Sequence, residues 1–207
     1  MIKNKITPEI KKAFLEEIQK TRDSGKEQGF LICLNDKENK NGKNKNGRLF
    51  VSKKRCTGEE CGFVIENVFE YCPDKVQGAF HTHPYFINVE RFYGRKPTEK
   101  EIDGAIKLYK KHFEKKGITL TTPSHHDLVD TLLNQCLGEA VGTVCTGNDL
   151  DLEKVECWTV KSEKVKVKDC TQANQEHKER IAEQPRKWIK PLFHKEIISL
   201  KTKKWWI

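Results

Sequence analysis

The sequence contains no apolar run of the roughly 20 residues that a membrane-spanning helix needs. Its first residues, MIKNKITPEIKKAF, lack the apolar core of a signal peptide, and no segment of the chain is repeated. No Cys-x-x-Cys pair occurs among the eight cysteines. These absences argue against a helical membrane protein and a repeat protein, and we expect a cytoplasmic protein with no membrane partner.

The chain is also poor in apolar residues, since 36% of its 207 residues are hydrophobic and 33% are charged. A chain of this length forms one good core but is short for two ordinary domains. The net charge is +9, and much of the excess lies within residues 37–55 and 186–204. A solvated lysine-rich face explains this charge most simply. A partner with an acidic surface, nucleic acid included, is the alternative, although no nucleic-acid-binding motif is present.

The cysteines have no spacing that indicates a disulfide framework. In the cytoplasm we expect most of them to be thiols, and many stand in apolar, strand-like segments where cysteine acts as a small hydrophobic residue. Cys56, Cys61 and Cys72 lie close together in the sequence, so a structural zinc site is an alternative there. Their spacing contains no tight pair of the kind that such sites use.

The N-terminal half predicts one helix followed by strands. Residues 7–21 have Thr7 as N-cap, proline at the first helical position and an apolar stripe, and Gly25 ends the helix. The loop at 35–47 is rich in Lys, Asn and Gly and predicts a hairpin connection. Strands are predicted at 29–34, 48–52, 62–69 and 75–83.

The C-terminal half predicts helices and strands in turn, so the fold class is α/β (α+β). An insertion at about 85–119 contains a helix at 97–116 with one apolar face. The elements after it are a helix at 124–137, strands at 140–147, 154–160 and 164–169, and a polar helix from 172 to about 182. We expect a domain at 1–170 and a basic helical C-terminal extension at 171–207. The aromatic residues of this extension would pack on the domain or on a second chain, in a homo-oligomer or a complex.

Two histidines stand at alternate positions of a predicted strand, in the segment GAFHTHP at 78–84. Side chains two apart along a strand share a face, so His81 and His83 project together while Phe80 and Thr82 point into the core. Two imidazoles on one side suit a metal ion, and the small residues around them leave space for it. A His-x-His pair on its own also occurs by chance.

A catalytic zinc site needs a third protein ligand and an open position. The segment PSHHD at 123–127 offers Asp127, although Ser124 with Asp127 three residues later also forms a purely structural helix N-cap. The two roles are compatible, because a capped helix start holds both side chains rigidly. His125 and His126 are alternative ligands that would lie on other sides of the first helical turn.

Together these segments resemble the JAMM, or MPN+, family of zinc metalloproteases. The matching pieces are KEQGFLICL with Glu27, HTHP with His81 and His83, PSHHD with Ser124 and Asp127, and the glycine-rich strand in GEAVGTVCTG. The resemblance implies a cytidine-deaminase-like mixed β-sheet flanked by helices, with Zn²⁺ held by the two histidines and Asp127. It also implies hydrolysis of a peptide or isopeptide bond in a protein or peptide substrate, such as the tail of a ubiquitin-like protein. Glu27 would be the general base, and Ser124 would donate a hydrogen bond to the developing oxyanion.

One feature departs from the family pattern, because about forty residues separate His83 from Ser124 where the family places the two motifs close together. The insertion fills this interval and would lie beside the active site. Glu101 and Asp103 are nearer alternatives to Asp127. However, PTEKEID lacks the Ser-x-x-Asp pattern, and the expected helix and glycine-rich strand follow PSHHD.

Other assignments stay open. Glu59, Glu60 and Glu66 are alternatives to Glu27 as the base. A catalytically inactive MPN-like scaffold or binding module is a second function, although every required residue type is present. A third function is association with nucleic acid through the tail at 188–207, where cations alternate with aromatic residues. The same tail could instead pack as a helix whose lysines reach solvent.

Overall fold

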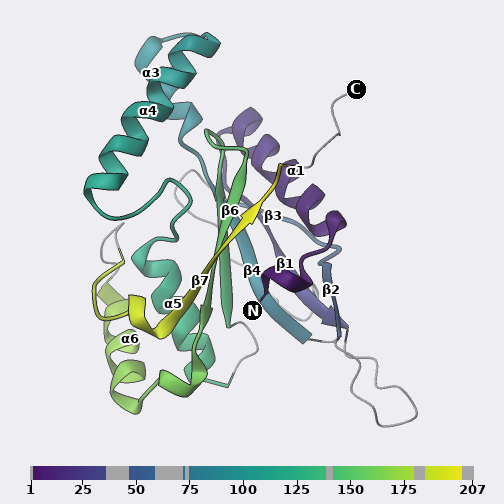
Figure 1. Ribbon diagram of the computed structural model, residues 1–207, viewed down its shortest axis with the longest axis vertical. Coiled ribbons are helices and arrows are strands. Elements are labelled where there is room, and N and C mark those ends of the chain that lie inside the picture. Colours follow the sequence, from purple (N-terminus) through teal and green to yellow (C-terminus); the bar gives the residue numbers. More distant parts are fainter. Residues whose placement is uncertain are drawn as a thin grey trace.

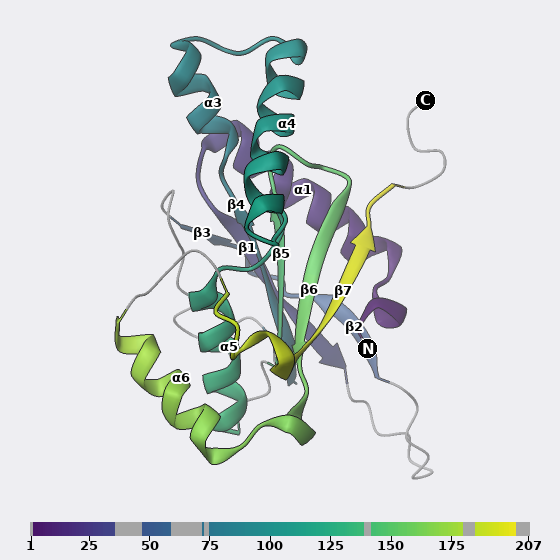
Figure 2. The ribbon, with the colours of Figure 1, turned by 60° about the vertical axis from the view of Figure 1, so that its left-hand side comes forward.

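The computed structural model describes residues 2–35, 47–58, 72, 75–138, 142–179 and 185–201. A curled, mixed β-sheet forms its centre. Helix α1 (Pro8–Ser24) covers one face of the sheet, and helices α5 (His125–Cys136) and α6 (Val167–Glu179) lie on the other (Figures 1 and 2). The predicted α/β (α+β) class is therefore confirmed. None of the helices in the described part of the chain is long and apolar enough to cross a membrane.

The sheet has the strand order β2-β1-β4-β5-β6-β7, and β3 also pairs with β1. Strands β4 and β5 run parallel, and every other pair among the described strands is antiparallel. The bounds are β1 Gln28–Asn35, β2 Arg48–Val51, β3 Cys56–Thr57, β4 Lys75–His83, β5 Thr143–Asn148, β6 Lys154–Val160 and β7 Phe193–Ser199. Short 3-10 turns occupy Lys3–Lys5, Ser162–Lys164 and Lys190–Leu192.

Helix α1 forms as its sequence predicts. The Thr7 side chain accepts a hydrogen bond from the Ile10 amide, and Gly25 ends the helix with a φ of 67°, a conformation that suits glycine. The apolar stripe of the helix faces the sheet, where Phe14 packs on Phe30 and Phe80 with ring centroids 5.6 and 4.6 Å apart. This cluster is the larger part of the core.

The other face of the sheet holds a second core, in which Leu128 and Leu132 of α5 pack with Val144 of β5 and Trp158 of β6. Two further helices, α3 (Phe86–Tyr93) and α4 (Glu99–Lys115), project beyond the end of the sheet (Figure 1). They are packed through a small cluster of their own that includes Leu150. The predicted insertion is therefore a helical subdomain of two helices, one of which the sequence did not reveal.

Two predictions for the C-terminal third are wrong. The alternating segment 164–169 is not a strand, because the Asp169 carboxylate accepts a hydrogen bond from the Lys166 amide and α6 begins at Val167. The extension at 171–207 is not wholly helical either, since Phe193–Ser199 form strand β7. Its residues pair with all of β6, which buries Phe193 and Ile198. The predicted boundary at 170/171 falls inside α6. The predicted strand at 62–69, most of the loop at 35–47 and Trp205 and Trp206 lie outside the described residues.

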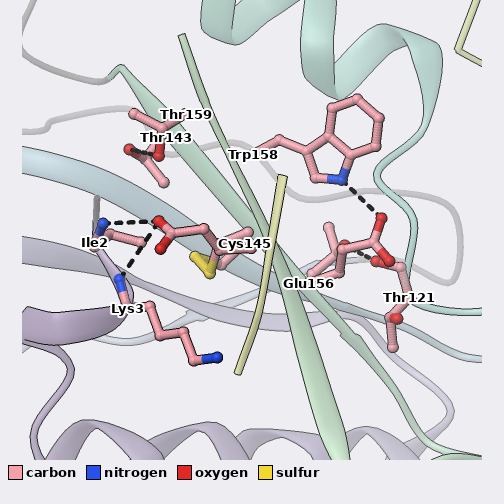
Figure 3. Close-up of a disulfide and its surroundings, with 11 residues drawn as sticks. Ile2, Lys3, Thr121, Thr143, Cys145, Glu156, Trp158 and Thr159 are labelled. Carbon is pink, nitrogen blue, oxygen red and sulfur yellow. Dashed lines mark hydrogen bonds between the residues drawn. A yellow bond between two sulfur atoms is a disulfide. The ribbon is translucent and has the colours of Figure 1, made fainter. Parts of the chain in front are cut away.

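Three disulfides contradict the prediction that the cysteines are thiols. Cys33 is bonded to Cys72, Cys136 to Cys170, and Cys145 to Cys157. Figure 3 shows Cys145, whose partner lies directly opposite it on the neighbouring antiparallel strand. Such pairs depend on positions that face each other in space, which sequence spacing does not reveal. Cys72 is bonded to Cys33, so its sulfur is not available for the alternative zinc site with Cys56 and Cys61. Disulfides are typical of oxidising compartments rather than of the cytoplasm. The cytoplasmic location stays a prediction.

The disulfide between α5 and α6 should contribute measurably to stability. Replacing Cys136 and Cys170 together by alanine should lower the free energy of unfolding by about 2–4 kcal/mol, because the bond restricts the unfolded chain. Urea unfolding monitored by circular dichroism measures the loss, and a reducing agent should shrink the difference between variant and wild type. Equal stability of the two proteins under oxidising conditions would contradict this expectation.

Candidate metal centre

His81 and His83 lie at the end of β4 and face helix α5. Strand β4 is held on both sides, since His81 pairs with Gly29 of β1 and His83 with Asn148 of β5. Phe80 belongs to the core under α1, and the hydroxyl of Thr82 is hydrogen-bonded to that of Thr21 in the same helix. The predicted division of this strand into two faces is confirmed.

Asp127 approaches the histidines from the first turn of α5. The Ser124 hydroxyl accepts a hydrogen bond from the Asp127 amide at 3.1 Å, and the Asp127 carboxylate accepts one from the Ser124 amide at 2.7 Å. This reciprocal cap fixes the carboxylate, because both its backbone and its side chain are held. The predicted capping role of the Ser-x-x-Asp pattern is therefore confirmed.

The three side chains converge on one point. The Nε2 atoms of His81 and His83 are 3.2 Å apart, and Asp127 Oδ2 lies 3.4 Å from the first and 3.9 Å from the second. A tetrahedral ion with ligand bonds of about 2.0–2.1 Å keeps its ligand atoms roughly 3.3–3.4 Å apart. Two imidazoles and one carboxylate are also a donor set of catalytic zinc sites.

Burial and mutual charge perturb this group strongly. Burial alone would lower the pKa of His81, but the charge and hydrogen bond of Asp127 raise it to about 9. Burial and the charge of His81 lower the pKa of His83 to about 4. Burial opposes ionisation of Asp127, yet the histidines and Ser124 hold the pKa of its carboxyl below the usual range. With a pKa raised in this way, a protonated His81 would balance the Asp127 carboxylate near neutral pH, a role that a metal cation also fulfils.

Glu27 lies beside the same group, in the connection between α1 and β1. The last pair of the β1–β4 ladder joins Gly29 to His81, and Glu27 stands two residues before this pair. The side chain is buried, and this burial raises the pKa of the Glu27 carboxyl to about 7, with the charges of His81 and Asp127 acting in opposite directions. Such a carboxyl exchanges a proton readily near neutral pH.

Backbone contacts fix the position of Glu27. Its carbonyl accepts a hydrogen bond from the Gly58 amide at 2.9 Å. The next residue, Gln28, donates its amide to Thr82 Oγ1 at 2.9 Å. Thr82 also contacts Thr21 of α1, so helix, strand and connection meet at one buried hydroxyl.

Glu156 supports the start of α5, and sequence reasoning missed it. The carboxylate is buried on β6 and accepts hydrogen bonds from Thr119 at 2.9 Å and Thr122 at 3.1 Å, both in the segment before Ser124. Figure 3 shows the indole of Trp158 donating to it at 2.7 Å. An acidic residue inside the apolar strand KVECWTV was the available signal, because a buried charge needs partners.

The alternative ligands and bases are placed elsewhere or lie outside the described residues. His125 is buried, and its Nε2 lies 2.5 Å from Glu176 Oε2 of α6. Glu101 caps α4 and pairs with Arg95 at 2.7 Å, and Asp103 does not belong to the converging group. Residues 59, 60 and 66 lie outside the described chain.

The helical insertion is attached directly to β4, the strand that carries His81 and His83. Asp149, immediately after β5, accepts hydrogen bonds from the Tyr85 and Phe86 amides at 2.8 and 2.9 Å. Its own amide donates to the His83 carbonyl at 3.4 Å, and the rings of His83 and Tyr85 meet edge to face. Burial raises the pKa of the Asp149 carboxyl to about 6. The insertion therefore begins at the end of the sheet where His83 lies.

No family model, curated protein or solved structure matches this chain. The structure brings Glu27, His81, His83 and Asp127 together and places Ser124 at the adjoining helix cap. Their roles in metal binding and catalysis stay predictions.

Thr82→Val should loosen the connection that carries Glu27. Valine keeps the shape of threonine but removes the oxygen that the buried Gln28 amide donates to, so the free energy of unfolding should fall by about 1–3 kcal/mol. Chemical denaturation measures this loss. Thr143→Val is the matched control: it breaks a bond to the Thr159 hydroxyl and leaves no backbone amide without its partner. An equal or larger loss in the control would show that Thr82 has no special role.

Proposed function

We propose that this protein is a zinc-dependent hydrolase of the JAMM type that cleaves a peptide or isopeptide bond. The observation that carries the proposal is the convergence of two imidazole nitrogens and one carboxylate oxygen within 3.9 Å of one another. A buried glutamate with a raised pKa lies beside them. These residues come from the same segments, in the same order, as in the family that the sequence resembles.

The arrangement of elements supports the finer fold assignment as well. A mixed sheet carries the histidines on a central strand, one helix covers the face behind them, and another helix brings Asp127 to the face in front. This agrees with the cytidine-deaminase-like sheet that the resemblance implies. A Zn²⁺ ion held by His81, His83 and Asp127 would polarise the scissile carbonyl and lower the pKa of water toward neutrality.

Glu27 would move the proton. Its carboxyl has a pKa of about 7, so near neutral pH it can accept a proton from the attacking water and return it to the leaving amine. Its buried position also keeps bulk water from competing for that proton. A solvated glutamate has an ordinary pKa and would hold the returning proton too weakly for this task.

Ser124 would stabilise the negative charge that develops on the carbonyl oxygen. Its hydroxyl accepts from the Asp127 amide, and a hydroxyl in this role still has one proton to donate. The backbone of the cap holds it beside the carboxylate ligand, so donation needs little rearrangement. Helices α3 and α4 lie beyond the same end of the sheet (Figure 1), which favours them as contacts for a protein or peptide substrate.

Zinc binding is the first test of this function. His81→Ala or Asp127→Ala should each remove one equivalent of tightly bound zinc and weaken that site by more than about 100-fold, because loss of even an outer-shell partner costs about 10–100-fold. Elemental analysis and competition with a chelator measure both effects. Glu101→Ala is the control and should keep full zinc content. Loss of zinc in the control, with retention in Asp127→Ala, would show that Glu101 and not Asp127 is the third ligand.

Glu27→Gln tests the catalytic step separately from metal binding. Glutamine keeps the size of the side chain but cannot accept the proton, so turnover should fall by about 10²–10⁴ while zinc content and melting temperature barely change. The exposed Glu16→Gln on α1 is the matched control.

Near-normal turnover by Glu27→Gln would shift the base to Glu59, Glu60 or Glu66. A second outcome is that fully zinc-loaded wild-type protein cleaves no ubiquitin-like fusion, no linear peptide and no small amide. That result would favour an inactive scaffold over an enzyme.

A further inference from the structure

A second group of metal-ligating side chains lies between α5 and α6, outside the centre described above. His126 and Asp130 are four residues apart on α5, and His177 comes from α6. One ligand atom from each residue lies within 4.8 Å of the other two. Across the described ranges, this group and the one at β4 are the clusters of this kind.

The donor atoms of this second group share one carboxylate. His126 Nε2 lies 3.3 Å from Asp130 Oδ2, and His177 Nδ1 lies 2.6 Å from Asp130 Oδ1. The two imidazole rings are stacked, with centroids 5.6 Å and planes 7° apart. Two imidazoles and a carboxylate suit zinc and leave room for water as a further ligand. All three side chains are partly exposed, so an ion can reach them from solvent.

Separate contacts already hold the two helices together. The disulfide from Cys136 to Cys170 joins α5 to α6, and the buried pair of His125 and Glu176 joins them again beside the exposed group. Figure 2 shows the helices side by side. Donor atoms that are arranged before binding lose little conformational freedom when a ligand arrives, which favours affinity.

We infer that His126, Asp130 and His177 form a second site for a divalent transition-metal ion, for which Zn²⁺ is the best fit. The ion replaces the direct hydrogen bond between His177 and Asp130 with bonds to all three residues. Because His126 directly precedes Asp127, the ion also clamps the helical turn that carries the proposed catalytic ligand. The second site shares no residue with the centre at β4 and does not depend on the proposed hydrolase activity.

Zinc titration of the His81→Ala/His83→Ala variant tests this site, because both substitutions lie on β4 and leave α5 and α6 unchanged. The probe is Zn²⁺ alone, added to metal-free protein with its disulfides intact. Calorimetry should detect about one equivalent, and zinc at a hundredfold excess over its Kd should raise the melting temperature by roughly 5 °C or more.

Three additional substitutions in that background separate a metal site from a fortuitous cluster. His177→Ala should abolish both the binding and the thermal shift. Asp130→Asn should do the same, although it keeps the size of the side chain and an oxygen for His177. His194→Ala removes an exposed histidine of β7 and should change neither measurement.

Two results would overturn the second site. One is absence of zinc binding by the His81→Ala/His83→Ala variant. The other is unchanged binding after His177→Ala, which would leave the three side chains as an ordinary hydrogen-bonded cluster. The centre at β4 is tested separately, by measuring the one equivalent of zinc that His81→Ala removes from the otherwise unchanged chain.

Discussion

The parallel pairing of β4 with β5 is the constraint on which the rest of the structure depends. Two parallel neighbours cannot be joined by a tight turn, so the chain that leaves β4 at His83 must return to the opposite end of the sheet before β5 begins. Helix α5 makes most of this return. Its first turn therefore starts near the level where β4 ends, and Asp127 meets the histidines there. The topology brings the three donor atoms together, and the long insertion between the two motifs leaves that geometry unchanged.

Each polar group in this region has both a structural and an electrostatic role. Asp127 caps α5, where a carboxylate is favoured by the free amides of the helix start. The same carboxylate is partly buried beside two imidazoles, which favours a balancing positive charge. Glu156 similarly ties the approach to α5 to strand β6 through buried hydrogen bonds, and Lys195 approaches it at 3.0 Å. Stability and site geometry are therefore linked in this half of the molecule.

The sequence revealed features that depend on local pattern and missed those that depend on distant partners. The strand alternation around His81 and the cap at Ser124 are local, and the structure has both. The disulfides, strand β7 and the pairing of His125 with Glu176 each join segments far apart in the chain. The spacing of residues along the sequence therefore did not predict them. Strand β7 lies in the segment that the sequence predicted as part of a basic helical extension. In the sheet the one lysine of β7, Lys195, pairs with the buried Glu156, and Phe193 and Ile198 are buried.

The segment PSHHD shows how one helical turn can serve three environments. Successive residues of a helix point about 100° apart. His125 turns inward to the buried Glu176, His126 lies in the partly exposed group with His177, and Asp127 faces the histidines of β4. The two adjacent histidines therefore cannot replace Asp127 as ligands without rotating the helix, which its cap and its disulfide to α6 oppose.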